Sequence, residues 1–365
     1  MSRESMKTRL TDNVSSFDLI GKKIVSKEHH MKNKRISIKD IARKANVSTA
    51  SVSRVISNKP GVGKDTQEKI KKIMTEMNYK PNINARSLVK NNTGNIGVIV
   101  PGGSNTIHNS FFLTIIEGIS RVIDQTEYNL IVSFTTKQHK KLLDTNIVDG
   151  ILVFAPRENE IDLEWLSNLN LPTVIIGSFL ENSKFDCISA DEKSGVKISV
   201  ENLYHKNHRK IALINGPSES YQSKIYKAGY ENTIKKLKLN QFILELSEFD
   251  IKGQETIVKN FLQTHDDVTG IICSSDNLAL GVMNIAKDLK LSIPDQLSII
   301  GSDNTPITNL ISPKLSTTNV NLKQIGETAV SRLFIKLNTS NHYTHPINCI
   351  FPMDFIERET TAFLK

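Results

Sequence analysis

The stretch SIKDIARKANVSTASVSRVIS, residues 37–57, decides the fold of the N-terminal part of this chain. Its apolar residues recur at helical spacing in two short blocks, and Ala45-Asn46-Val47 separates the blocks. We therefore predict a helix over about Ile38–Lys44, a tight turn, and a second helix whose N-terminus is capped by Ser48. The stretch is typical of a helix-turn-helix.

The outer face of the second predicted helix is small, polar and close to the positive end of the helix dipole. Such a helix fits the major groove of DNA, which is about 12 Å wide, with its first turn against base edges and its N-terminal amides against phosphate. An ordinary helical hairpin is the alternative interpretation of the same pattern. The candidate DNA contacts are Ser48, Thr49, Ala50, Ser51, Ser53 and Arg54.

The net charge of +9 is concentrated in one part of the chain. Residues 31–95 hold 15 basic and 4 acidic side chains, whereas residues 96–365 hold 26 basic and 30 acidic ones. A basic block on an acidic body indicates a nucleic-acid-binding head on a separate domain. A solvated basic face would produce the same local charge.

The pattern after residue 57 predicts a loop and a third helix. The loop is NKPGVGK, which is rich in turn-forming residues. Asp65-Thr66 should begin the helix, with Glu68 in its first turn, where the helix dipole favours an acidic side chain.

Beyond Asn95 the pattern changes to short apolar runs separated by amphipathic stretches of helical length. The runs are NIGVIV, YNLIVSF, DGILVF, PTVIIG, KIALIN, TGIICS and LSIIGS, and the helical stretches include Phe111–Asp124, Ser223–Leu237 and Asn277–Leu289. This alternation predicts an α/β fold with doubly wound parallel sheets. Roughly 270 residues exceed one such sheet, so we expect two Rossmann-like lobes with a ligand cleft at the carboxyl ends of their strands.

Composition excludes several classes of protein. A chain of 365 residues with 38% hydrophobic residues is neither disordered nor collagen-like. It has no run of 18 apolar residues and no signal-peptide pattern at its start, so we expect a cytoplasmic protein that does not associate with a membrane. We find no nucleophile, phosphate-loop or metal-ligand pattern, and therefore predict no enzymatic activity, no cofactor and no metal.

The cysteines and two of the histidines receive structural interpretations. Cys187, Cys273 and Cys349 are far apart in apolar surroundings, so we expect buried, reduced thiols. His205 and His208 are three residues apart but lack further ligands at metal-binding spacing, which favours histidines at a helix end.

Several motifs together resemble the lactose-repressor/galactose-repressor family of bacterial transcription regulators. The match is nearly unbroken over Ile38–Val98 and includes SVSRVIS, NYKPN and ARSL. Further along, VDGILV, NHRKIALINGP, AGY, SSDNLALGV, IIGSDN, ISPKLSTT and IERETT follow in the family's order. NSFFLTIIEGISRV and VIIGS are most similar to the maltose-operon branch of the family.

The resemblance implies a hinge helix after the headpiece. The segment Ile83–Val89 is shorter than the roughly 12–15 residues that an isolated helix needs in water, so alone it should be unfolded. In the family this segment becomes helical when two subunits pair in the minor groove, where a leucine kinks the duplex. The matching hinge residues here are Asn82, Asn84, Ala85, Ser87 and, as the wedge, Leu88.

The resemblance also implies an effector cleft in a core like that of periplasmic binding proteins. The matching positions are Asn109, Phe111, Asp191, Tyr226, Ser275, Asp276 and Asp303. Tyr226 stands where the family commonly has an arginine. That departure argues against an anionic effector and for a neutral sugar stacked on this ring, such as a maltodextrin. Asp276 and Asp303 as helix caps, and Phe111 as a core residue, are the alternatives.

The expected partners are a palindromic double-stranded DNA operator, a small sugar-like effector and a second copy of the chain, with dimer or tetramer left open. Binding of the effector should change operator affinity allosterically. One rival is a global catabolite regulator whose core binds a phosphocarrier protein. Another is a sugar receptor without a role on DNA.

These interpretations divide the chain into four parts. They are a flexible extension over 1–34, a headpiece over 35–80, a hinge helix and linker over 81–93, and an effector core over 94–365. Within the core we expect lobe 1 to comprise about 94–189 and 318–344, and lobe 2 about 190–317 and 345–365. A start of translation at Met6 or Met31 is a hypothesis that the intact mass of the native protein would test.

Overall fold

The computed structural model of the protein describes residues 36–57, 59–79, 92–101, 110–158, 161–180, 182–339 and 345–364. The chain divides into two compact units, Met1–Lys90 and Asn91–Lys365, and each is described by itself. The predicted extension over 1–34 and nearly all of the predicted hinge and linker over 81–93 lie outside the described residues.

The described part of the first unit is a three-helix headpiece. Its helices are α2 (Ile38–Ala45), α3 (Thr49–Ile56) and α4 (Lys64–Glu76). One buried cluster joins them, and its members are Ile41, Ala42, Ala45, Val52, Val55, Ile70 and Ile73. Asn46 makes the turn between α2 and α3 with a left-handed φ of 57°, which Asn tolerates better than most residues. The predicted helix-turn-helix is confirmed.

The start of α4 differs from the prediction. Gly63 occupies the N-cap, so Asp65 lies in the first helical turn and does not cap it. The side chain of Gln67 donates a hydrogen bond to the carbonyl oxygen of Val62 at 2.8 Å, which holds the incoming chain against the helix. The negative charge still faces the positive end of the helix dipole.

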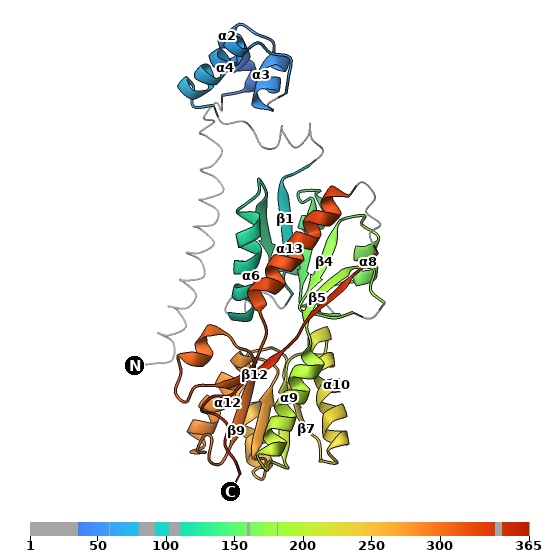
Figure 1. The fold of residues 1–365 in the computed structure, drawn as a ribbon, viewed down its shortest axis with the longest axis vertical. Coiled ribbons are helices and arrows are strands. Elements are labelled where there is room, and N and C mark those ends of the chain that lie inside the picture. Colours follow the sequence, from blue (N-terminus) through green and yellow to red (C-terminus); the bar gives the residue numbers. More distant parts are fainter. Residues whose placement is uncertain are drawn as a thin grey trace, which may run out of the picture. The chain divides into compact units, whose positions relative to one another are not determined.

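The first lobe of the second unit contains a six-stranded sheet whose pairings are all parallel, in the order β11-β5-β4-β3-β1-β2 (Figure 1). Its strands are β1 (Asn95–Ile99), β2 (Asn129–Ser133), β3 (Gly150–Phe154), β4 (Thr173–Ile176), β5 (Asp186–Ala190) and β11 (Asn348–Phe351). Helices α6 (Ser110–Ile123), α7 (Thr136–Asp144), α8 (Leu163–Ser167) and α13 (Leu322–Asn338) cover it.

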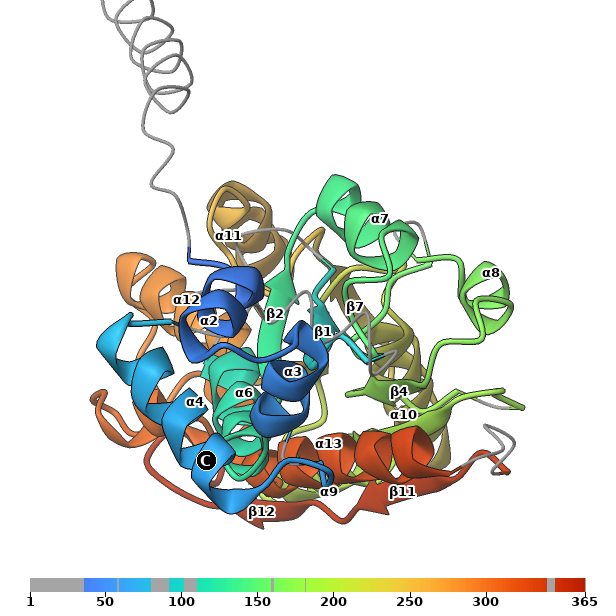
Figure 2. The same cartoon turned by 90° about the horizontal axis from the view of Figure 1, so that it is seen from above.

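Successive residues of the central strands face opposite layers of this lobe. On β3, Leu152 packs into the cluster formed with α6 and α13, whereas Val153 packs into the cluster formed with α7 and α8. Figure 2 shows α6 and α13 on one side of β1 and β4, with α7 and α8 on the other. A parallel sheet covered on both faces explains why these strands are nearly continuous apolar runs.

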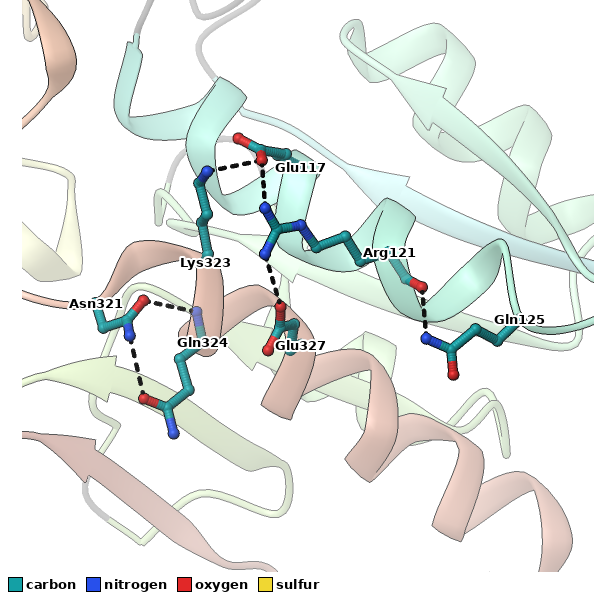
Figure 3. A network of polar contacts seen from close by, with 7 residues as sticks. All are labelled: Glu117, Arg121, Gln125, Asn321, Lys323, Gln324 and Glu327. Atoms are coloured by element: carbon teal, nitrogen blue, oxygen red, sulfur yellow. Dashed lines mark hydrogen bonds and ion pairs between the residues drawn. The ribbon is translucent and has the colours of Figure 1, made fainter.

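Helices α6 and α13 approach each other closely because each has a glycine at the crossing. A Cβ on Gly118 would lie 2.1 Å from the carbonyl oxygen of Lys323, and one on Gly326 would lie 2.2 Å from that of Ile115. A polar network on the exposed side joins the same helices (Figure 3). Arg121 contacts Glu117 at 2.9 Å and Glu327 at 3.6 Å, and Lys323 contacts Glu117 at 2.7 Å.

The second lobe repeats the architecture with a sheet in the order β12-β10-β9-β8-β6-β7. Its strands are β6 (Ile211–Asn215), β7 (Phe242–Glu245), β8 (Gly270–Cys273), β9 (Ser298–Asp303), β10 (Ser316–Asn319) and β12 (Asp354–Ile356). All pairs are parallel except β10 with β12. Its helices are α9 (Glu192–His205), α10 (Tyr221–Lys236), α11 (Glu255–Thr264), α12 (Asp276–Asp288) and the short 3-10 helix η2 (Pro306–Asn309).

Packing alternates in this lobe as well. On β6, Ile214 faces the cluster that includes residues of α11 and α12, and Leu213 faces the cluster that includes residues of α9 and α10. The predicted α/β class with two doubly wound lobes is confirmed.

The chain crosses between the lobes at three places, and the third crossing corrects the predicted lobe boundaries. β5 leads into α9, β10 leads into α13, and β11 leads into β12. We expected all of residues 345–365 in lobe 2. Instead β11 pairs with β5 and forms the edge of the first sheet, with Cys349 opposite Ile188, so the chain returns to lobe 2 only after Phe351.

Five strands escaped the apolar-run criterion, β5 and β10 because polar residues occupy them, and β7, β11 and β12 because they are short. In β10, Ser316, Thr317 and Thr318 are fully buried, since their hydroxyls find partners within the lobe. In β5 the fully buried Asp186 accepts a hydrogen bond from Arg332 at 2.6 Å. β7, β11 and β12 are short and only partly buried.

The described residues also locate the thiols and histidines. All three cysteines are free; Cys187 and Cys273 are buried, and Cys349 is half-buried, less than expected. His205 ends α9, and His208 contacts Thr269 Oγ1 at 3.0 Å and the carbonyl oxygen of Ala362 at 3.1 Å. None of the described helices combines the length and apolar character needed to cross a membrane.

Candidate functional site

Helix α3 presents its N-terminal turn at the headpiece surface. The Ser48 hydroxyl accepts a hydrogen bond from the amide of Ser51 at 3.0 Å, which caps the helix as predicted. Thr49 and Ala50 are exposed in the first turn, and Ser51 and Ser53 are half-buried beside them. The first-turn amides carry the positive end of the helix dipole, a local environment that suits a phosphate or a base edge.

Arg54 lies exposed on α3 and rests on the following loop. A Cβ on Gly61 would lie 3.3 Å from Arg54 Nη1, and the backbone of Gly61 has a φ of 107°, which glycine adopts without strain. The amide of Lys59 donates to the carbonyl oxygen of Arg54 at 2.9 Å. The loop therefore constrains the side chain that is best suited to contact a base or a phosphate.

The hinge residues predicted to contact DNA lie outside the described residues. They are Asn82, Asn84, Ala85, Ser87 and Leu88.

A cavity of about 340 Å³ lies between the two lobes of the second unit. From the first lobe its wall includes Pro101, Phe111, Phe154, Ala155 and Arg157; from the second it includes Gln222, Glu248, Phe249, Ser274, Ser275 and Asp303. Several of these residues end or directly follow strands β1, β3, β8 and β9. The cavity thus occupies the carboxyl ends of parallel strands, where ligand sites of such sheets form.

Aromatic rings form the apolar part of this cavity. The rings of Phe111 and Phe154 have centroids 5.6 Å apart and are inclined by 56°. On the second lobe, Phe249 packs directly against the backbone of Gly216, where a Cβ would lie 2.3 Å from the ring. Ring faces of this kind suit the apolar side of a small cyclic ligand.

An ion pair connects the lobes at the cavity wall. Arg157 Nη2 donates to Glu248 Oε2 at 2.7 Å and Nη1 donates to Oε1 at 3.3 Å, so the contact is bidentate. The arginine side chain is mostly buried. The neighbouring amide of Glu158 donates to the carbonyl oxygen of Glu219 at 3.1 Å. These contacts hold the lobes in the relative orientation of this structure.

The floor of the cavity is acidic. Asp303 lines it with 4% of its surface exposed, and Glu192 is equally buried behind Gln222. Gln222 Nε2 donates to Glu192 Oε1 at 3.1 Å. Burial raises the pKa of Glu192 to about 7, and nearby Asp191 adds to this. Burial, followed by repulsion from Asp276 and Glu192, raises the pKa of Asp303 well above its usual value.

Three of the predicted effector residues line the cavity, whereas the carboxylate of Asp276 points away from it. Phe111, Ser275 and Asp303 line the cavity, whereas Asn109 lies outside the described residues. The Asp276 carboxylate accepts hydrogen bonds from the amide and hydroxyl of Thr305 at 2.7 and 2.8 Å, and from the Thr317 hydroxyl at 2.6 Å. Asp276 therefore joins α12 to β10 and η2.

Asp191 and Tyr226 also lie away from the cavity, and the stacking role expected for Tyr226 is wrong in this structure. Asp191 caps α9 by accepting hydrogen bonds from Ser194. Tyr226 is only 1% exposed and packs in the core against α9 and β6, so its ring has no free face for a sugar. Burial raises the pKa of Tyr226 well above its usual value, which keeps its hydroxyl neutral.

Sequence reasoning missed most of the polar cavity residues. Arg157, Gln222 and Glu248 lie in loops or at a helix start, and no local pattern distinguishes them from other surface polar residues. Phe154 offered a signal because it ends the apolar run DGILVF, at the edge of the sheet where the cleft was expected. Glu192 directly follows Asp191, but only the tertiary structure places it beneath the cavity.

Comparison with known proteins agrees with both halves of this arrangement. Residues 37–82 match the family described as bacterial regulatory proteins, lacI family, and residues 200–361 match a periplasmic binding protein-like domain. The ribose operon repressor of Haemophilus influenzae is 30% identical over 315 residues, which cover 84% of this chain and 93% of that protein. The chain belongs to the lacI family of bacterial regulatory proteins.

Further relatives extend the similarity of this lacI-family chain. The HTH-type transcriptional repressor PurR of Vibrio vulnificus is 31% identical over 316 residues, with 84% of this chain and 93% of the relative covered. A crystal structure of the lac repressor dimer bound to operator and the anti-inducer ONPF superimposes with a TM-score of 0.77. It is 22% identical, covers 90% of this chain and 100% of its own, and supports the fold alone.

As a lacI-family member, the protein is a DNA-binding transcriptional regulator and not an enzyme. Its helix-turn-helix is the headpiece of α2, α3 and α4, and its two-lobed core contains the cavity.

Proposed function

We propose that the protein is a homodimeric repressor that binds a roughly palindromic operator and is controlled by a small, sugar-like effector bound between its lobes. One α3 from each subunit would enter a major groove, with Ser48, Thr49, Ala50, Ser51, Ser53 and Arg54 at the contact. In this proposal the hinge segment connects headpiece and core, with Leu88 as the minor-groove wedge.

The observation that carries the effector part is the composition of the cavity wall. Phe111 and Phe154 come from one lobe, and Phe249 and Asp303 come from the other. A ligand that contacts both walls at once binds one relative orientation of the lobes better than others. Such differential binding changes operator affinity by a coupling free energy that is typically on the order of 1–3 kcal/mol.

The cavity suits a polyhydroxylated ring. Its volume of about 340 Å³ lies at the lower end of ligand sites, which span roughly 300–1,000 Å³. Aromatic faces pack against the apolar side of a sugar, while Ser274, Ser275 and Gln222 provide hydroxyl and amide partners. A maltodextrin is one candidate, and whether the effector induces or corepresses is left to experiment.

Fluorescence anisotropy on DNA tests both parts. The full chain should bind a labelled palindrome from upstream of a neighbouring sugar-transport gene, and one member of a sugar panel should shift that affinity at least fivefold, the lower end of the coupling above. Leu88→Ala should weaken operator binding strongly and leave sugar affinity intact. The matched control is Leu310→Ala, since the Leu310 side chain is 79% exposed on the surface of the second unit.

Different failures have different meanings. If the chain shows no sequence preference on DNA, the operator part of the proposal is wrong. If Leu88→Ala binds operator like the control, the wedge is wrong. If every sugar fails but a phosphorylated carrier protein shifts the affinity, the catabolite-regulator alternative replaces the sugar effector.

A further inference from the structure

Two buried carboxylates at the cavity floor have oxygens that accept no hydrogen bond from any described residue. These atoms are Asp303 Oδ1 and Glu192 Oε2. Asp303 lines the cavity directly, and Glu192 reaches it through Gln222, which lines the cavity and is 5% exposed. Buried polar atoms in folded proteins nearly always have partners, so the unpartnered oxygen of Asp303, which lines the cavity, points to a partner that enters from the cavity.

Carboxylates dominate the charged groups that the structure describes around this floor, and Arg358 is the cation beside them: it attracts Asp276 and donates a hydrogen bond to the Asn304 side chain. Asp303 faces the negative charges of Asp276 and Glu192, and Glu192 also faces Asp191. The nearest cavity-lining guanidinium is that of Arg157, whose bidentate partner is Glu248. Lys252 lies at the exposed rim beside Asp250. With Asp303 ionised, the lining has three carboxylates, Glu248, Asp250 and Asp303, against the two cations Arg157 and Lys252.

Tyr226, another titratable group near Glu192 and Asp303, is neutral. The Tyr226 hydroxyl lies beside Ser302 and Thr318, whose hydroxyls bond each other at 3.0 Å, and it lies within electrostatic range of both Glu192 and Asp303. A phenol that stays neutral cannot compensate a buried carboxylate charge. Burial raises the pKa of Glu192 to about 7 and that of Asp303 above its usual range, so near neutral pH the two groups favour their protonated forms.

The backbone also holds Asp303 in an uncommon conformation. Its φ is 103°, in a region that L-residues rarely adopt. Such strain costs on the order of 1–3 kcal/mol and concentrates at functional sites. Here it coincides with a side chain that lines the cavity and has an unpartnered oxygen.

We infer that the effector of this protein carries a positively charged amino group, as an amino sugar does, and that Asp303 with Glu192 behind Gln222 receives it. This inference rests on the proposed effector site and specifies its chemistry. An ammonium supplies several hydrogen-bond donors and one positive charge, so it can satisfy the unpartnered oxygen of Asp303 and compensate the charge of Asp303 and, through space, of Glu192. A neutral sugar of the same shape supplies donors but no charge.

Binding should release a proton. As the ammonium enters, it stabilises the ionised form of the carboxyl pair, and the proton that the pair loses goes to solvent. Affinity should therefore rise between about pH 5.5 and pH 7, an interval in which a typical amine stays protonated. A neutral sugar should show much less pH dependence, because it does not favour the charged form as strongly.

Isothermal titration calorimetry on the full chain tests this with matched sugars. The pairs are D-glucosamine with D-glucose, D-galactosamine with D-galactose, and D-mannosamine with D-mannose, and the N-acetylated sugars serve as uncharged analogues of similar shape. We expect one amino sugar to bind at least tenfold tighter than both of its uncharged analogues. Titration in two buffers of different ionisation enthalpy should detect the released proton.

Two variants locate the effect. Asp303→Asn and Glu192→Gln keep the shape of each side chain, and Asn accepts a positive φ readily, so both proteins should fold. Each should reduce the preference for the amino sugar over its neutral partner at least fivefold. The control Asp266→Asn changes an exposed carboxylate after α11 and should leave the preference unchanged.

The inference is overturned if no amino sugar binds, if a neutral sugar binds equally well, or if Asp303→Asn keeps the full preference. These outcomes are distinct from failure of the proposed function. A neutral sugar that shifts operator affinity would leave the sugar-controlled repressor standing and remove only the amino group. Loss of sequence-specific DNA binding in the anisotropy assay would remove the proposed repressor function and leave the amino-sugar site in the cavity standing.

Discussion

Replacing Gly326 by alanine tests how tightly α6 and α13 are packed. The new Cβ would lie 2.2 Å from the carbonyl oxygen of Ile115 and 3.1 Å from the amide nitrogen of Ile119. Ordinary van der Waals contact begins at 3.4 Å, so the two helices must separate by about 1 Å. The opposing atoms belong to the backbone of a helix and cannot rotate away as a side chain would.

The magnitude follows from two opposing effects. Overpacking of a dense core costs about 1–3 kcal/mol. Exchanging a glycine inside a helix for alanine recovers roughly 0.5–1 kcal/mol of that cost. The net loss of at most about 2.5 kcal/mol corresponds to a decrease in melting temperature of up to about 10 °C for a domain of this size.

The fluorescence of Trp165, the single tryptophan of the chain, reports on the first lobe, because Trp165 lies in α8 and α8 covers the sheet that α6 and α13 also cover. Thermal unfolding followed at this residue should show the decrease for Gly326→Ala. Gly229→Ala is the matched control, since Gly229 is also inside a helix and its Cβ would meet Lys193 Cα at an ordinary 3.4 Å. If both variants melt alike, the close contact of α6 and α13 does not limit the stability of the lobe.

Three further predictions concern the headpiece, the second lobe and pH. Ile41→Ala removes most of a fully buried side chain and should destabilise the headpiece by about 2–5 kcal/mol. Operator binding should therefore be lost, while the thermal transition followed at Trp165 in the second unit should not change. A shifted transition would show that the two units do not unfold separately. Asp276→Ala leaves three buried donors of Thr305 and Thr317 without their acceptor. Because each unpaired group costs about 1–3 kcal/mol, urea unfolding should show a loss of at least about 3 kcal/mol, and a loss below about 1 kcal/mol would show that Asp276 does not join α12 to β10 and η2. The pKa of Glu192 rises from its ordinary 4.5 to about 7 on folding, so its contribution to stability is complete below pH 4.5 and is lost as the pH rises through 7. Glu192→Gln should therefore flatten the pH dependence of the melting temperature over that interval, and parallel curves for the two proteins would refute the assignment.

Local pattern was sufficient for the headpiece and for the central strands. Helical periodicity predicted α2 to within a residue, and the Ser48 cap predicted the start of α3, because the buried stripe and the cap are local features of the sequence. The central strands of both sheets were equally visible, since a strand covered on both faces must be apolar along its whole length. The resemblance of the motifs then predicted the family and its two-lobed core, which comparison confirmed.

Polar residues that become buried were the main source of error. Nothing local in STTN indicates that Ser316, Thr317 and Thr318 form a buried strand, because each hydroxyl finds its partner on a distant segment. The same holds for β11, which belongs to the first lobe only because β5 offers it an edge.

The amino acid sequence by itself thus determined which segments become helices and strands, which class of fold they form, and that the protein reads DNA. Only the tertiary structure decided that Tyr226 faces the core, that Arg157 and Glu248 join the lobes, and that Glu192 comes within electrostatic range of Asp303 at the cavity. The reason is physical. Periodicity and capping act between residues a few positions apart, whereas desolvation and charge depend on groups that the fold brings together from across the chain.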